Sequence, residues 1–162
     1  MSAHALPVSY ASPVPHLPVG SLACAGWFGA LPELMKERQV AEVIRLSPLT
    51  LQGWRQTGSG PVFERIGRNI RYPRTALLGW ISESRVTTED EYEIEALAPS
   101  IMLTETEAGD QLGFEGQTLR DWRWRRRGPA FFRLGSDTIR YALTDLLAYR
   151  SARRFANTSQ YS

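Results

Sequence analysis

Two short stretches of the chain concentrate the side chains with the clearest chemical potential. Residues 120–127 contain five arginines, and residues 52–56 contain Gln52, Arg55 and Gln56. Glutamine can pair with adenine, and arginine with guanine, through two hydrogen bonds each. Arginine also forms forked hydrogen bonds with phosphate. The two stretches therefore favour contact with nucleic acid, and solvated helix surfaces are the plain alternative.

Groups that usually carry catalysis are scarce in this sequence. The single cysteine, Cys24, excludes a disulfide scaffold and a zinc site built on a CxxC pair. The two histidines, His4 and His16, lie in a proline-rich stretch. Neither residues 31–85 nor residues 102–154 contain paired carboxylates, a nucleophile–base set, metal-ligand spacing or a phosphate loop. We therefore expect no enzyme, and no cofactor, metal or small-molecule ligand is evident.

Charge is distributed unevenly along the 162 residues, although the formal net charge is only +2. Residues 31–85 carry nine basic and five acidic side chains, residues 86–101 carry five acidic and no basic ones, and residues 102–162 carry ten arginines and seven acidic residues. Two basic blocks with an acidic connector fit nucleic-acid binding. No stretch approaches the roughly 20 apolar residues that cross a bilayer, so we expect no membrane partner.

The sequence contains an internal repeat. The segment TLQGWR at 50–55 returns 68 positions later as TLRDWR at 118–123, and Gly60-Pro61 returns as Gly128-Pro129. After one inserted residue, IRY at 70–72 returns as IRY at 139–141. Self-similarity at a fixed offset indicates duplicated structural units. The chain is therefore predicted to contain two related units of roughly fifty residues.

Local patterns predict the same elements in both units. The first unit is expected to have a helix over 36–44, a helix from the cap Ser47 to about Gly58, β runs over 62–66 and 70–72, and a helix over 74–83. The second is expected to have a helix from Thr104 to Leu112, a helix over 117–126, a hairpin turning at 135–137, and a helix opened by Thr144. Glu107 completes a capping box with Thr104.

These elements and motifs resemble a known family. The run LTETEAGDQLGF at 103–114, followed by TLRDWR, GPAFFRLG and IRY, resembles the MerR-like/excisionase helix-turn-helix module of phages, plasmids and integrative elements. The resemblance covers about residues 34–85 and 102–153. The first unit departs from the pattern at Met35-Lys36 and at Arg45, where the family usually has glycine in the turn.

The resemblance implies a mainly α fold with small β-hairpin wings, arranged as tandem winged helix-turn-helix domains. The expected organisation is a disordered or docking leader over 1–30, a first domain over 31–85, an acidic linker over 86–101, a second domain over 102–154, and a flexible tail over 155–162. The expected location is the cytoplasm, in association with the nucleoid.

The implied function is double-stranded DNA binding within a mobile element, as an excisionase-type recombination directionality factor, a transcriptional regulator, or both. Integrase contact or self-association along DNA is a further expectation. Two linked units predict two dissimilar half-sites about one helical turn, ~34–36 Å, apart. The alternative is a phage or plasmid assembly or packaging subunit that recognises DNA but acts mainly through protein docking.

The expected DNA contacts follow from the exposed faces of the second helices, opposite Leu51 and Trp54, and from the hairpin tips. Arg55 and Arg123 are expected to bind phosphate, and Trp124 to wedge against DNA, meet a partner or cover an arginine. The first-unit contacts are Leu49, Thr50, Gln52, Arg55, Gln56, Arg68, Asn69 and Arg71. The second-unit contacts are Gln117, Thr118, Arg120, Arg123, Trp124, Arg125, Arg126 and Arg140.

Overall fold

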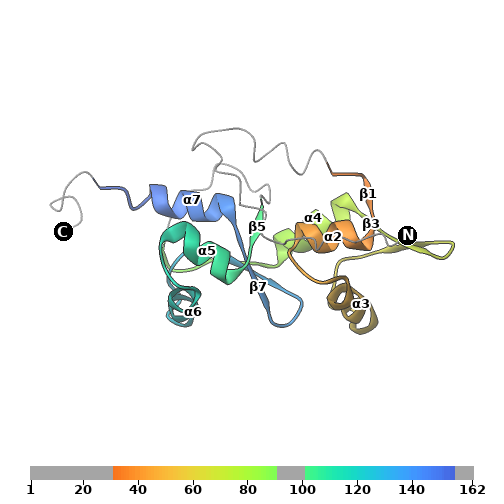
Figure 1. The fold of residues 1–162 in the computed structure, drawn as a ribbon, viewed down its shortest axis with the longest axis horizontal. Coiled ribbons are helices and arrows are strands. Elements are labelled where there is room, and N and C mark those ends of the chain that lie inside the picture. The colour runs from red at the N-terminus through yellow and green to blue at the C-terminus, as the bar shows by residue number, and fades with distance from the viewer. Residues whose placement is uncertain (1–30, 91–100, 156–162) are drawn as a thin grey trace, which may run out of the picture.

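The computed structural model of the chain describes residues 31–90 and 101–155. The predictions for the leader, for most of the acidic linker and for the tail fall outside these residues. The described part is mixed α/β, with helices and small antiparallel sheets (Figure 1). None of its helices has the length and apolar character that a membrane span requires.

The first half of the described chain follows the predicted order. Its elements are β1 (Leu34–Met35), α2 (Glu37–Val43), α3 (Pro48–Thr57), β2 (Glu64–Ile66), β3 (Asn69–Pro73) and α4 (Arg74–Glu83). The second half has β5 (Met102–Leu103), α5 (Glu105–Leu112), α6 (Gly116–Trp124), β6 (Phe131–Leu134), β7 (Thr138–Ala142) and α7 (Leu143–Ser151). Between them lies β4 (Arg85–Val86), which, like the short strands β1 and β5, was not predicted from the sequence pattern.

The sheets show equivalent pairing in the two halves, with one addition. Met35 pairs with Tyr72 across β1 and β3, and Leu103 pairs with Tyr141 across β5 and β7. Within the described residues, the strand order is β1-β3-β2 in one sheet and β4-β6-β7-β5 in the other. Strand β4 follows α4 of the first half and pairs with β6 of the second half. The second sheet is therefore completed by the first half of the chain.

The predicted caps Ser47 and Thr104 are confirmed, whereas α7 begins at Leu143, one residue before the predicted start Thr144, with Ala142 at its N-cap. The Thr50 amide donates to Ser47 Oγ at the start of α3. At α5, the Glu107 amide donates to Thr104 Oγ1 over 3.3 Å, and the Thr104 amide donates to Glu107 Oε2 over 2.9 Å. These reciprocal bonds satisfy amides that have no partner within the helix.

The turns before α3 and after α6 place arginines in left-handed backbone. Arg45 has a φ of 57°, at the position where the second half has Gly113 with a φ of 77°. Arg126 has a φ of 55°, and α6 ends at Trp124, two residues before its predicted end. A non-glycine residue in this region costs of order 1 kcal/mol, so neighbouring contacts must hold it there.

Two buried cores lie in the described structure, and the larger one is shared by the two halves. It combines first-half residues such as Leu51 and Leu77 with Phe132, Leu134 and Ala142 of the second half. The smaller core contains Leu103, Ala108, Leu119, Phe131, Tyr141, Leu143 and Leu146. Apolar burial is the main favourable term in folding, so the shared core holds the two halves against each other.

Candidate nucleic-acid interface

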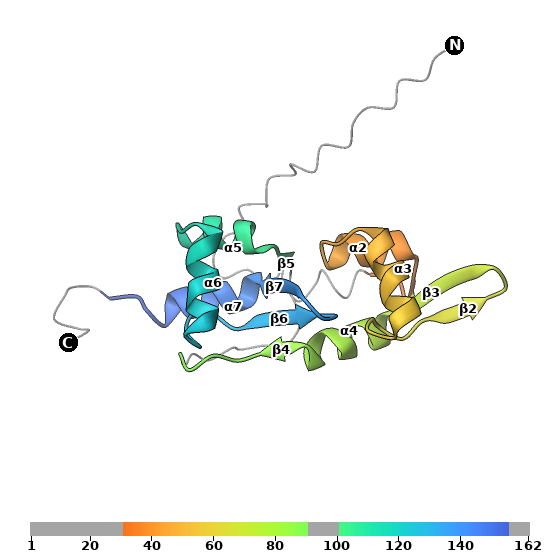
Figure 2. The ribbon, with the colours of Figure 1, turned by 90° about the horizontal axis from the view of Figure 1, so that it is seen from below.

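Helices α3 and α6 project from the same side of the molecule. Figure 1 shows both below the sheets, and Figure 2, which views the molecule from below, shows both facing the viewer. These are the second helices of the α2–α3 and α5–α6 pairs, and the two helices carry most of the predicted contact residues. A single surface therefore presents both helices.

Helix α3 has a polar solvent face with one large apolar side chain. Leu49 is 74% exposed, and Gln56 is exposed about two turns further along. Gln52 is half-buried because its Nε2 donates to Glu37 Oε2 over 3.3 Å. Thr50 is half-buried and helps to form the Ser47 cap. Leu49 and Gln56 are thus the side chains of α3 with the most freedom to reach a ligand.

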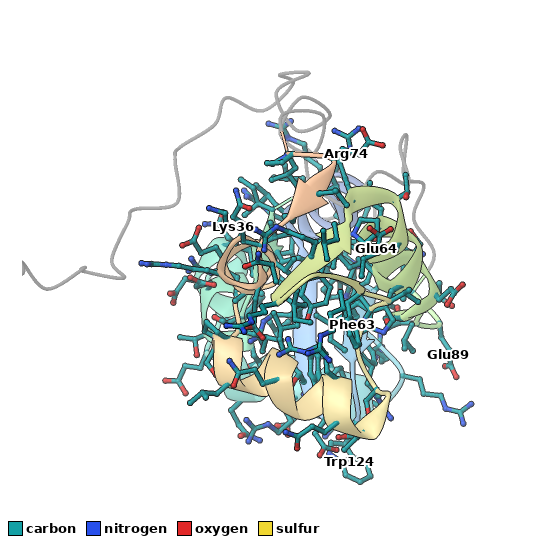
Figure 3. The ribbon with its side chains drawn as sticks, turned by 90° about the vertical axis from the view of Figure 1, so that its right-hand side faces the viewer. Lys36, Phe63, Glu64, Arg74, Glu89 and Trp124 are labelled. Carbon is teal, nitrogen blue, oxygen red and sulfur yellow. The ribbon has the colours of Figure 1, made fainter. Side chains whose placement is uncertain are left out.

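Helix α6 has a more basic solvent face than α3. Gln117 Nε2 donates to Asp121 Oδ1 over 3.0 Å, and Arg120 Nη1 donates to Gln117 Oε1 over 3.3 Å. Thr118 is half-buried, whereas Arg125, Arg126 and Arg127 are exposed. Among the described large apolar residues Trp124 is the most exposed, at 85%, and Figure 3 shows it at the edge where α3 also lies.

Arg55 forms an internal network instead of facing solvent. Its guanidinium pairs with Glu37, donates to the Tyr72 hydroxyl over 2.8 Å, and lies 5.7 Å from the centre of the Phe63 ring. Burial raises the pKa of Tyr72, although its bond to Arg55 acts in the opposite direction. Burial opposes the charged form of Arg55, but the bonds to Glu37 and Tyr72 outweigh it and raise the pKa of Arg55.

Arg123 repeats this network in the second half. It pairs with Glu105 over 3.1 Å, donates to the Tyr141 hydroxyl over 2.7 Å, and lies 5.6 Å from the centre of the Phe131 ring. Its side chain is only 14% exposed. Both arginines therefore tie the second helix to the first helix and the hairpin. This arrangement differs from the solvent-facing phosphate contacts predicted for Arg55 and Arg123.

The carboxylates of these networks were missed by the sequence analysis. Glu37 and Glu105 are 68 positions apart, the same offset that relates Arg55 to Arg123. That shared offset was the available signal. Glu105 also lies 3.3 Å from Arg120, so it links a buried arginine to one on the solvent face of α6.

The tip of the first hairpin is open. Arg68 and Asn69 are exposed at the turn between β2 and β3. Arg71 is half-buried and donates to the carbonyl of Ile70 over 2.8 Å. Arg65 on β2 is also exposed and was not among the predicted contacts. This hairpin therefore offers two arginines and an asparagine to a ligand.

The second hairpin is directed toward the first half of the chain. Arg140 Nε donates to the carbonyl of Ile44 over 3.0 Å, and its Nη2 donates to the carbonyl of Arg45 over 2.5 Å. Burial lowers the pKa of Arg140, the charge of Arg45 adds to this effect, and Glu107 opposes it. Arg140 is thus engaged with the α2–α3 turn, whereas the sequence analysis predicted that it contacts DNA.

A groove of about 420 Å³ lies between the end of α6 and the second hairpin. Its polar lining includes Arg123, Arg126, Arg133 and Asp137, and Trp124 stands at its edge. Arg133 is exposed and corresponds to Arg65 in the repeat, so both were missed on equivalent strands. Arginines beside an aromatic ring suit a phosphate backbone or an exposed base.

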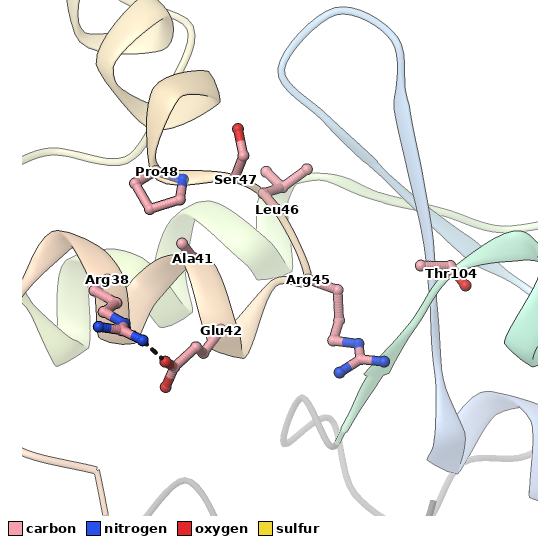
Figure 4. Close-up of a pocket in the computed structure, with 8 residues that line it drawn as sticks. All are labelled: Arg38, Ala41, Glu42, Arg45, Leu46, Ser47, Pro48 and Thr104. Atoms are coloured by element: carbon pink, nitrogen blue, oxygen red, sulfur yellow. Dashed lines mark ion pairs between the residues drawn. The ribbon is translucent and has the colours of Figure 1, made fainter. Parts of the chain in front are cut away.

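A second pocket, of about 480 Å³, lies at the junction of the two halves. It is lined by the α2–α3 turn and by Thr104 of the second half, and Figure 4 shows Arg45 between them. The guanidinium of Arg45 pairs with Glu107. Burial alone would raise the pKa of Glu107, but its bonds from Thr104 and Arg45 lower it overall. In residues 31–90 and 101–155, no cluster of three or more metal-binding side chains occurs.

One family model matches the chain. Residues 34–85, which run from β1 to the start of β4, match a family described as a helix-turn-helix domain. No curated protein and no solved structure matches the chain. The matched segment contains the α2–α3 pair, the open hairpin and α4. Residues 34–85 are therefore similar to a helix-turn-helix domain.

Proposed function

We propose that the chain is a double-stranded DNA-binding protein that uses α3 and α6 together. The observation that carries this proposal is the placement of both helices on one surface (Figure 2), where Leu49, Gln56, Gln117, Arg120 and Trp124 are exposed. The helix-turn-helix match over residues 34–85 supports DNA as the partner. An α-helix fits the major groove, where base edges can be distinguished.

We further propose that residues 102–154 are a second winged helix-turn-helix domain of the same kind. The sequence repeat, the equivalent strand register and the two Glu–Arg–Tyr networks support this proposal. In each half, the network orients the second helix against the hairpin. Arg55 and Arg123 then act as positioning residues, and the exposed arginines supply the phosphate contacts.

The proposed contacts divide into two groups. The proposed base contacts are Gln56, Gln117 and Arg120. Gln52 can join them only after its hydrogen bond to Glu37 is broken. Arg68, Asn69, Arg125 and Arg126 bind the backbone, and Arg65 and Arg133 join them as exposed residues on equivalent strands. Phosphate contacts position a protein on the duplex, and base contacts give it sequence preference.

The biological role proposed for this binding is that of an excisionase-type recombination directionality factor or a transcriptional regulator of a mobile element, located in the cytoplasm with the nucleoid. Exposed apolar side chains on the first hairpin and just before it, Val62, Phe63 and Ile66, favour protein contact beside the DNA. An integrase or a second copy of the chain is the proposed partner there. The alternative is an assembly or packaging subunit. In that case the same apolar residues would bind a partner protein, and this docking would be the main activity.

The proposal is tested by measuring the affinity of the full chain for selected and random duplexes over a range of salt concentrations. Arg125→Ala should weaken binding to every duplex and reduce the magnitude of the salt slope by about 1. Arg120→Ala should instead relax preference at particular base pairs, at a cost of ~1–3 kcal/mol on the selected site. Arg150→Ala is the matched control, because Arg150 is an exposed arginine on α7, away from α3 and α6 in Figure 1.

Equal affinity for selected and random duplexes would remove the sequence-reading role and favour the docking alternative. Equal effects of all three substitutions would show that charge alone drives binding. Absence of binding at low salt would contradict the DNA proposal itself, since the phosphate term supplies affinity for any duplex.

A further inference from the structure

We propose that the second hairpin, β6–β7, is a clamp that fixes the spacing and rotational phase of α3 and α6. The affinity for DNA then depends on the distance between the two half-sites as well as on their base sequences. This inference rests on the proposed DNA-binding function. In this arrangement the two halves form one rigid unit that binds both half-sites, and they are not two domains joined by a flexible linker.

The first support is the pair of hydrogen bonds from Arg140 to the α2–α3 turn. The two accepting carbonyls belong to Ile44 and Arg45, immediately after α2 in the turn that leads to α3. Carbonyls at the end of a helix lack partners within it, so a guanidinium that supplies both donors stabilises the turn. The contact also holds Arg45 in its left-handed conformation. Arg140 therefore connects the second hairpin to the turn that leads into α3.

The second support is the packing of the hairpin turn on α3. A Cβ atom added at Gly135 would lie 2.6 Å from Cε2 of Trp54. Only a residue without a side chain fits so close to the indole ring, and the φ of 62° at this turn also favours glycine. Beside it, Leu134 is fully buried in the shared core. The hairpin therefore contacts the body of α3 as well as the turn before it.

The third support is a set of contacts on other sides of the junction. Arg45 pairs with Glu107, which caps α5. Strand β4 pairs with β6, and Arg85 at its start donates to Asp145 of α7 over 2.6 Å. Contacts spread around the junction resist rotation as well as separation. Domain motion is expected only where such an interface is small or polar, and this one includes a buried core.

A rigid reader and a flexible pair of domains respond differently to inserted base pairs. Ten to 10.5 base pairs make one turn of ~34–36 Å, so five extra pairs place the second half-site on the opposite face of the duplex. Ten extra pairs restore the face and change only the distance. Two flexibly linked domains would still bind both half-sites of the duplex with ten extra pairs, because these again lie on one face. The clamped protein would bind both half-sites in neither lengthened duplex.

The experiment measures the affinity of the full chain for the selected duplex with zero, five or ten base pairs inserted between the half-sites. For the natural chain we expect either insertion to prevent the second half from binding together with the first. The affinity should therefore fall by ~10²-fold or more. Recovery of affinity with ten inserted pairs would overturn the clamp, as would equal affinity for all three duplexes.

Arg140→Ala should flatten the dependence on spacing, because it removes the bonds to Ile44 and Arg45. Arg71→Ala is the matched control: Arg71 and Arg140 each donate to the carbonyl of the preceding residue, but Arg140 alone of the two is bonded to the other half. Gly135→Ala provides a second disruption through Trp54 if Arg140→Ala does not fold. Equal spacing dependence in the natural chain and in a folded Arg140 or Gly135 variant would overturn the role of the hairpin.

A measurement without DNA separates failure of the clamp from failure of the proposed function. Spin labels on Gly53→Cys and Gln117→Cys, in a Cys24→Ser background, report the distance between α3 and α6. The natural sequence should give one narrow distribution, and Arg140→Ala a broader one. A broad distribution in the natural sequence overturns the clamp whatever the DNA results. A narrow distribution with no duplex binding retains the clamp and rejects the DNA proposal.

Discussion

The two hairpins of this chain have related sequences and a left-handed glycine at the start of each turn, but their surroundings differ. Gly67 and Gly135 both have left-handed φ values, 64° and 62°. Ile66 of the first hairpin is 50% exposed, whereas its counterpart Leu134 is fully buried. Figure 2 shows β2–β3 extending away from the molecule and β6–β7 pointing toward the first half.

The comparison teaches that a duplicated element can take two roles according to what lies beside it. The second hairpin meets the first half of the chain, so its apolar residues are buried and Arg140 finds two backbone acceptors. No such neighbour covers the first hairpin among the described residues, and its tip keeps Arg68 and Asn69 exposed. We therefore propose that the tip of the first hairpin contacts the ligand, and the second hairpin holds the two halves together.

The largest expected difference concerns the two turn glycines. Alanine at either position lowers the free energy of unfolding by about 1 kcal/mol, because the left-handed backbone is unfavourable for a residue with a Cβ atom. At Gly135 the added Cβ also meets Trp54, and overpacking of this kind costs a further ~1–3 kcal/mol. Gly67 has nothing within 4 Å of the added atom. Urea unfolding should therefore show that Gly135→Ala loses about 3 kcal/mol and Gly67→Ala about 1 kcal/mol. Equal losses would contradict the docked position of the second hairpin.

The next effect separates internal arginines from exposed ones. Arg123→Ala leaves Glu105 and Tyr141 without their shared donor, so the free energy of unfolding should fall by about 2 kcal/mol. Arg125→Ala, two residues later and exposed, should change stability by less than about 0.5 kcal/mol. Chemical denaturation of both variants checks this. A stable Arg123→Ala variant with weakened DNA binding would restore the phosphate-contact role predicted from the sequence.

The tip of the open hairpin should contribute to DNA affinity, whereas the tip of the docked hairpin should not. Arg68→Ala removes one exposed cation from the first tip, so the logarithmic salt slope should decrease in magnitude by about 0.9 and affinity should fall by ~1 kcal/mol. Ser136→Ala changes the equivalent residue of the second tip and should leave both quantities unchanged. Fluorescence anisotropy in a salt series measures both variants. Identical salt slopes for the natural chain and Arg68→Ala would remove the first hairpin from the interface.

The smallest effect is a dependence of the junction on acidity. Because folding lowers the pKa of Glu107, this carboxylate stabilises the folded state above its unfolded pKa, and the contribution is lost as pH falls through the lower, folded pKa. Stability should therefore decline below about pH 4. Glu107→Gln retains a side chain suited to the capping box but removes the charge, so it should lessen this decline in a pH series of thermal unfolding. An unchanged pH profile would show that the Arg45–Glu107 pair contributes nothing to stability.

Local features of the fold could be predicted from the sequence because their causes are local. Ser47 and Thr104 cap helices through residues three positions away, and the two hairpins turn near Gly67 and Gly135 as expected. The exposure of Leu49 and Trp124 also follows from helical periodicity. The end of α6 was predicted too late because the left-handed Arg126 gives no signal in a periodic pattern.

Partners distant in the sequence could not be predicted in this way. Arg140 bonds to residues 95 and 96 positions earlier, and strand β4 pairs with a strand more than 40 residues later. No helical or strand period connects such segments. Arg55 and Arg123 were placed in the correct elements, but their direction depends on Glu37 and Glu105 from the preceding helices. Basic residues near a predicted groove therefore need their acidic neighbours identified before they are assigned to DNA.

Hydroxyl-radical footprinting of the full chain on its selected duplex tests the central claim most directly. Joint use of α3 and α6 predicts two protected patches on one face of the duplex, about one helical turn apart. Arg120→Ala should weaken one patch, and Gln56→Ala the other. Protection of a single patch, with the second half of the chain leaving no footprint, would contradict the account.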